Sequence, residues 1–96
     1  MANIFKRERK PKSINILGHK ISVVIVDHLD DEDQALVGAF NADTKTIFLE
    51  KGCEKSVLFH EVIHAALYLS GNSQGLSNNR EESIVLALEH AIFPLI

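Results

Sequence analysis

The sequence predicts an α+β domain in which a small three- to four-stranded sheet is followed by two helices. Short runs rich in β-branched residues occupy the first half of the chain, and turn residues bound each run. From Cys53 onward, the apolar residues recur at helical spacing. A chain of 96 residues has room for one small domain. We expect that domain to span residues 14–96, after a basic flexible arm at residues 1–13.

The composition is that of an ordinary globular protein, with 46% hydrophobic residues, 24% charged residues and a net charge of −3. A single cysteine cannot form an internal disulfide, so the fold does not require an oxidising compartment. No apolar run reaches the roughly 18 residues of a membrane span, and the N-terminus lacks the apolar core of a signal peptide. We therefore expect a cytoplasmic protein without a membrane partner.

The N-terminal segment MANIFKRERKPKS is polar and basic, which is typical of a flexible arm or of a weakly anchored first strand. Its five positive charges could contact a phosphate backbone. A solvated tail is the preferred interpretation of these charges, so a nucleic-acid partner is not expected. Residues 14–28 then predict two strands around a turn at Gly18-His19, since residues 21–26 are almost all β-branched.

The segment DHLDDEDQ, residues 27–34, is acidic and predicts a solvated loop. It lacks the glycine and the distal glutamate of a helix–loop–helix calcium site, so calcium binding is not expected. The next segment, residues 35–51, predicts a β-hairpin, because Asn41, Asp43 and Thr44 supply turn chemistry between two apolar runs. This hairpin completes the expected sheet.

The first helix is predicted within CEKSVLFHEVIHAALYLSG, with Glu54 in its first turn and Gly71 ending it. Cys53 falls near the helix start, but no histidine base stands beside it in sequence, so we interpret it as structural. A loop at residues 72–79 leads to a second helix, REESIVLALEHAIF, which ends before Pro94. The apolar stripe of the first helix is Leu58, Val62, Ala65 and Leu69; that of the second is Ile84, Val85, Leu88, Ala91 and Ile92.

Three polar residues interrupt the apolar run FHEVIHAALYLSG, residues 59–71. His60 and His64 are four residues apart, so both imidazoles project from one helix face and can hold one zinc ion. Glu61 is turned by about 100° around the axis, where it can reach a water on the metal and act as a general base. The pattern is HExxH, here HEVIH. The alternative is a set of core side chains satisfied by their neighbours.

A catalytic zinc usually takes three protein ligands, and the third must come from outside the motif. Position 70 is a serine, which removes the three-histidine version. Glu81 shares the phase of Ile84 and Val85, so it is expected to point toward the core. Glu82 is in phase with Leu86 and Glu89 and is expected on the outer face, and His90 lies about 13 Å beyond Glu81 along the axis. Glu81 is the preferred third ligand and Glu82 the alternative.

The arrangement HEVIHAALYLSG, a polar loop and then NREESIVLALEHAIF resembles the minimal zincin-like metallopeptidases of phages and prophages, which are related to the ImmA/IrrE group of gluzincins. The resemblance covers residues 14–96 and includes the strand TIFLEK before the motif helix. It implies one zinc ion per chain, with His60 and His64 as ligands, Glu61 as the catalytic base and Glu81 as the third ligand. Many relatives have asparagine before that glutamate, whereas this chain has Arg80.

The function expected from these residues is zinc-dependent hydrolysis of peptide bonds, by a water on the zinc that Glu61 activates, in a peptide or protein substrate. Tyr68 could stabilise the oxyanion, although a packed tyrosine is the preferred interpretation. The strand at residues 44–50 could accept an extended peptide along its edge. Two alternatives stay open: a zinc-binding regulatory or assembly module without peptidase activity, and a nucleic-acid-associated protein that uses the arm at residues 6–12.

Overall fold

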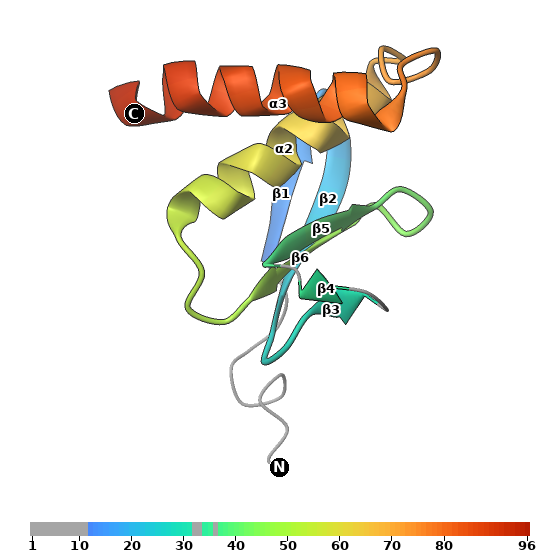
Figure 1. The fold of residues 1–96 in the computed structure, drawn as a ribbon. Helices are drawn as coiled ribbons and strands as arrows, with labels where there is room; N and C mark the ends of the chain where they lie inside the picture. The colour runs from blue at the N-terminus through green and yellow to red at the C-terminus, as the bar shows by residue number, and fades with distance from the viewer. Residues whose placement is uncertain (1–11, 32–33, 36) are drawn as a thin grey trace.

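The computed structural model describes residues 12–31, 34–35 and 37–96, and it confirms the α+β class. A four-stranded mixed sheet is followed by two helices (Figure 1). The sheet has the order β1-β2-β6-β5. The β2–β6 pair is parallel and the other two pairs are antiparallel. Its strands are β1 (Lys12–Ile16), β2 (His19–Val26), β5 (Gly38–Asn41) and β6 (Thr46–Glu50).

The predicted hairpin of residues 35–51 is present, as β5 and β6 joined by a turn at residues 42–45. The prediction that the strand at 44–50 forms an edge is wrong. β6 pairs with β2 on one side and with β5 on the other, so β5 is the terminal strand. The reason is burial: Ile47 and Leu49 are buried from the helix side of the sheet, and a central position covers both backbone edges of their strand.

Three strand boundaries differ from those expected. β1 begins at Lys12, so the first strand takes two residues from the predicted arm, and residues 1–11 lie outside the described part of the chain. His19 begins β2 and does not lie in the turn, which is formed by Leu17 and Gly18 at φ 51° and 84°. The predicted acidic loop contains a small antiparallel pair, β3 (Asp30–Asp31) and β4 (Gln34–Ala35). The expectations that this segment is solvated and does not bind calcium depend mainly on the side chains of residues 30–34, which lie outside the described set.

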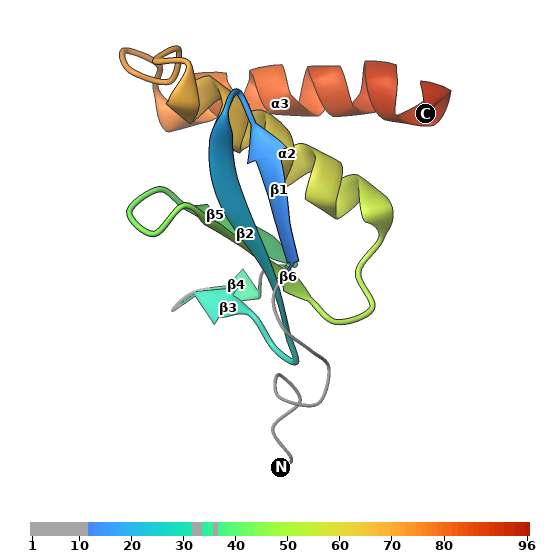
Figure 2. The same ribbon diagram turned by 180° about the vertical axis from the view of Figure 1, so that it is seen from behind.

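The first helix, α2 (Lys55–Leu69), covers one face of the sheet (Figures 1 and 2). The buried core joins sheet and helix; its members are Ile16, Ile21, Val23, Ile47, Leu49 and Ala65. The predicted stripe faces this core, since Leu58, Val62 and Leu69 pack against it. Gly71, at φ 83°, follows the C-cap Ser70 and ends the helix as expected. Glu54 is the N-cap residue in extended conformation, so it precedes the first turn instead of lying in it.

The second helix, α3 (Asn78–Ile92), crosses α2 on the side away from the sheet (Figures 1 and 2) and continues into the short 3₁₀ helix η1 (Phe93–Leu95). It begins two residues earlier than predicted because the Ser77 side chain accepts a hydrogen bond from the backbone N–H of Arg80 at 3.1 Å. It ends before Pro94, as predicted. None of the helices in the described ranges is long and apolar enough to cross a membrane.

Candidate metal centre

The two motif histidines lie one turn apart on the face of α2 that meets α3. Their ring centroids are 5.0 Å apart, and the His60 and His64 side chains are only 17% and 20% exposed. The i, i+4 spacing places both rings on one face, as the sequence predicts. Both imidazoles are therefore withdrawn from solvent and open toward the side chains of α3.

Glu82 of α3 lies between the two rings. One of its carboxylate oxygens, Oε2, is 3.2 Å from His60 Nε2, and the other, Oε1, is 3.0 Å from His64 Nε2. A single carboxylate therefore contacts the Nε2 atoms of both rings. One ligand atom each from His60, His64 and Glu82 can be chosen so that all three lie within 4.8 Å of one another.

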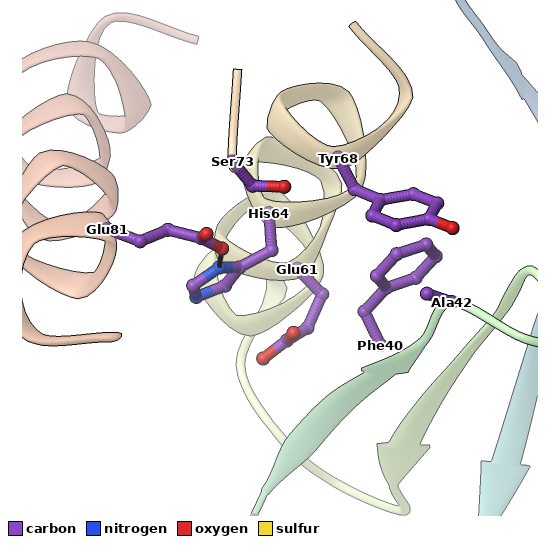
Figure 3. Close-up of a pocket in the computed structure, with 7 residues that line it drawn as sticks. All are labelled: Phe40, Ala42, Glu61, His64, Tyr68, Ser73 and Glu81. Atoms are coloured by element: carbon purple, nitrogen blue, oxygen red, sulfur yellow. Dashed lines mark hydrogen bonds and ion pairs between the residues drawn. The ribbon is translucent and has the colours of Figure 1, made fainter. Parts of the chain in front are cut away.

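Two further carboxylates occupy the other nitrogens of the same rings. Glu89 Oε1 lies 2.8 Å from His60 Nδ1, and Glu81 Oε2 lies 2.6 Å from His64 Nδ1 (Figure 3 shows the second pair). Glu81, the preferred third ligand in the sequence, therefore contacts His64 at Nδ1, and Glu82 contacts the same ring at Nε2. The nitrogen atoms that converge are the Nε2 atoms, and Glu82 is the residue that reaches both of them.

The expectation that Glu82 and Glu89 lie on the outer face of the second helix holds only in part, because the Glu82 side chain is 47% exposed but both glutamates contact the imidazoles of α2. It assumed that the apolar stripe marks the inward face, but Leu88 and Ile92 are 37% and 41% exposed, whereas the Glu89 side chain is 17% exposed. α3 instead turns the residues around Val85, its one buried residue, toward α2. The signal in the sequence is the spacing of Glu82 and Glu89 at three before and four after Val85, which puts them on one face.

In each imidazole, therefore, both nitrogens contact a carboxylate, and each nitrogen contacts a different glutamate. A neutral imidazole carries one N–H, so it can donate to one carboxylate only, and its other nitrogen presents a lone pair to the second. Lone pairs that face each other across about 3 Å repel in a site of low dielectric. The arrangement is satisfied when each ring gains a proton, or when one cation binds the two Nε2 lone pairs together with Glu82.

Two groups of the site, His60 and Glu61, have raised pKa values. Burial lowers the pKa of His60, but the hydrogen bond to Glu89 and the charges of Glu82, Glu61 and Glu89 outweigh burial, so the net pKa is raised. Burial raises the pKa of Glu61; the two histidines oppose this rise, and Glu82 and Glu89 add to it. Four carboxylates around two histidines thus create a strongly negative site that favours a cation.

The residues present fit a zinc ion. Imidazole nitrogens and a carboxylate are common zinc ligands, and ligands at about 2.0–2.2 Å from a tetrahedral ion lie about 3.3–3.6 Å from one another. The observed separations of the two Nε2 atoms from Glu82, at 3.2 and 3.0 Å, are close to that spacing. A slight opening of the site would admit the ion between them.

Beside the histidines lies a cavity of about 320 Å³. Figure 3 shows its walls: Phe40, Ala42, Glu61, His64, Tyr68, Ser73 and Glu81. Glu61 is a buried residue whose carboxylate faces this cavity. Tyr68 stacks at a tilt on Phe40 at 6.0 Å but is 47% exposed, so it is less packed than the sequence suggests.

The remaining sequence candidates lie apart from the centre. Cys53 packs against the core, and burial raises the pKa of its thiol, which favours the structural interpretation. His28 and His90 are exposed.

The chain matches no protein-family model, no curated protein and no solved structure.

Proposed function

We propose that this protein binds one zinc ion through His60, His64 and Glu82 and uses it to hydrolyse peptide bonds. The observation that carries the proposal is the double contact of each imidazole with carboxylates, which calls for a positive charge between the two Nε2 atoms. A divalent ion supplies that charge at neutral pH without requiring both rings to be protonated. Glu82 replaces Glu81 as the third ligand in this proposal, because it is the carboxylate that reaches both rings.

Glu61 is the general base in the proposed reaction. It lies on α2 between the proposed ligands His60 and His64, and its carboxylate faces the cavity that His64 also lines. Its raised pKa makes it a better proton acceptor than an exposed glutamate. Bound zinc would polarise the scissile carbonyl and lower the pKa of a water. Glu61 would take the proton of the attacking water and give it to the leaving amine.

The terminal strand β5 offers a place for an extended peptide. Gly38 in β5 passes so close to α2 that a Cβ there would lie 3.2 Å from Glu61 Cγ. β5 therefore passes beside the Glu61 side chain, and Phe40 of the same strand lines the cavity with Glu61 (Figure 3). A substrate strand that pairs with β5 by main-chain hydrogen bonds would carry its own carbonyls past Glu61.

Metal content of the purified protein tests the site. We expect about one zinc per chain by elemental analysis, and near-complete loss in His60→Ala and His64→Ala. His90→Ala, which changes an exposed histidine on α3, is the matched control and should keep the metal. A wild-type chain that remains metal-free after incubation with zinc would remove the proposal and leave an ion-pair cluster of protonated histidines.

Glu61→Gln tests the chemistry separately. The variant keeps the shape of the side chain but loses the base, so zinc should stay bound while cleavage of a mixed peptide library falls by about 10²-fold or more. Zinc binding by a wild-type chain that cleaves no peptide would replace the peptidase by a zinc-bearing regulatory or assembly module.

A further inference from the structure

Glu89 is the carboxylate of the site that contacts His60 at Nδ1, the nitrogen that Glu82 does not contact. It reaches back from α3, seven residues and about two turns after Glu82, to meet His60 Nδ1 at 2.8 Å. The side chains of both partners are 17% exposed, so the contact is made largely out of water. Two glutamates on one face of α3 therefore contact the His60 ring, Glu82 at Nε2 and Glu89 at Nδ1.

We propose that Glu89 is a positioning residue for the zinc site: it fixes the orientation and the tautomer of His60. The inference rests on the zinc site proposed above. His60 donates its Nδ1–H to the Glu89 carboxylate, and this leaves the lone pair on Nε2, on the side where Glu82 and His64 converge. The negative charge of Glu89 also makes the ring a stronger electron donor at Nε2.

A role in packing alone does not account for the contact. A buried carboxylate that merely filled space would be better replaced by an apolar residue, since burying a charge costs free energy unless it is paired. The apolar stripe of α3 is available for that purpose, yet Leu88 next to it is the more exposed residue. The helix therefore places the charged Glu89 inward although Leu88 is its neighbour in sequence. This placement indicates that His60 requires a carboxylate at Nδ1.

His60 needs this support because its ring can otherwise rotate. A flip of the imidazole about χ2 puts Cε1 where Nε2 stood and Cδ2 where Nδ1 stood, and the other tautomer places a proton where the metal lone pair is required. His64 has the equivalent contact with Glu81, at 2.6 Å. Without Glu89, the metal would have to select the productive orientation from a mixture, and the affinity would fall accordingly.

The test uses two substitutions and three readouts. Glu89→Gln keeps an oxygen that can accept from Nδ1 but loses the charge, and Glu89→Leu removes both. Zinc affinity is measured by competition with a chromophoric chelator, the geometry of the site by the visible absorption of the cobalt(II)-substituted protein, and the fold by thermal unfolding in the presence of a chelator. Glu54→Gln, at the exposed N-cap of α2, is the matched control.

We expect zinc affinity to fall by about tenfold in Glu89→Gln and by about 10²-fold in Glu89→Leu, with altered cobalt bands in both and no change in Glu54→Gln. The metal-free variants should unfold cooperatively, with midpoints no more than about 5 °C below that of the metal-free wild type. Unchanged affinity and cobalt spectra in both variants would overturn the positioning role while leaving the zinc site intact. Affinity loss only in variants whose metal-free form no longer unfolds cooperatively would assign Glu89 to packing and overturn it too. A wild-type chain that binds no zinc would remove both proposals.

Discussion

Among the single residues of the site, Glu81 and Glu82 are adjacent in sequence, but their carboxylates contact different histidine nitrogens. Glu82 contacts the Nε2 atoms of both rings, whereas Glu81 contacts His64 at Nδ1. One residue of helix rotation, about 100°, separates the two side chains. The proposed ligand is therefore Glu82, and Glu81 supports His64 from behind in the way that Glu89 supports His60.

Replacing each glutamate by glutamine should separate these two positions. Glu82→Gln removes a ligand charge, and we expect zinc affinity to fall by about 10²-fold or more; Glu81→Gln removes only an outer contact, and we expect a fall of about tenfold. Chelator competition on the two purified variants measures both values. The reverse order, with the larger loss in Glu81→Gln, would restore Glu81 as the third ligand.

The raised pKa of His60 gives the metal-free protein a specific pH dependence. A raised folded-state pKa contributes stability that is fully present below the usual histidine value of about 6.5 and is lost as pH rises through the folded value. The raised pKa of Glu61 acts in the same direction, because its burial costs free energy once it ionises. With a chelator present, we expect the midpoint of thermal unfolding to be lower at pH 8 than at pH 6.

Zinc should reverse this trend. The metal competes with protons for the two imidazoles, so its binding strengthens as pH rises over the same interval. Unfolding scans at pH 6 and pH 8, with chelator and with excess zinc, give the four midpoints required. A metal-free midpoint that rises between pH 6 and pH 8 would contradict the assigned direction of the His60 shift.

At the scale of elements, the chain shows which features a sequence can predict. The facing of His60 and His64 depends only on their spacing within one helix, and the hairpin depends on local turn residues, so both were predictable. The rotation of α3 was not, because it depends on how two helices meet. The spacing of apolar residues identifies the inward face of a helix only where that face is apolar. Here the face of α3 toward α2 carries Glu82 and Glu89 as well as Val85. The parallel pairing of β2 with β6 is likewise a long-range contact without a local signal.

The contact between β5 and α2 depends on a residue without a side chain. A Cβ on Gly38 would lie 2.6 Å from Val57 Cγ1 and 3.3 Å from Glu61 Oε2. We expect Gly38→Ala to push the strand and helix apart, to lower stability by about 1–3 kcal/mol and to reduce any hydrolysis by displacing Glu61. Denaturant unfolding measures the stability loss, with zinc content recorded in parallel.

The matched control for this prediction is Val57→Ala, made both in the wild-type chain and in the Gly38→Ala variant. Shortening Val57 removes the nearest atom, so the double variant should lose less stability than the sum of the two single losses. Strictly additive losses would show that the clash with Val57 is not what makes Gly38 necessary.

At the scale of the whole molecule, the site joins α3 to the layers formed by α2 and the sheet. The sheet and α2 form the described core, whereas α3 rests on α2 and buries fully only Val85. The three glutamates of α3 contact the two histidines of α2, and Phe59 of α2 packs at 5.6 Å against Phe93, which follows α3. A metal held between them therefore acts as a cross-link between α3 and the rest of the fold.

Removing the metal should loosen α3 before the sheet. Zinc at about 100 times its dissociation constant stabilises the folded state by about 2.7 kcal/mol, which corresponds to a rise in the unfolding midpoint of about 11–22 °C for a domain of this size. Because the metal bridges the helices, we expect chelation to increase amide hydrogen exchange most in α3, less in α2 and least in β2 and β6. Exchange measured by mass spectrometry with and without chelator resolves these segments, and His90→Ala serves as the control with its zinc retained. Equal acceleration in β6 and α3 would mean that the metal stabilises the domain as one unit and does not pin α3 in particular.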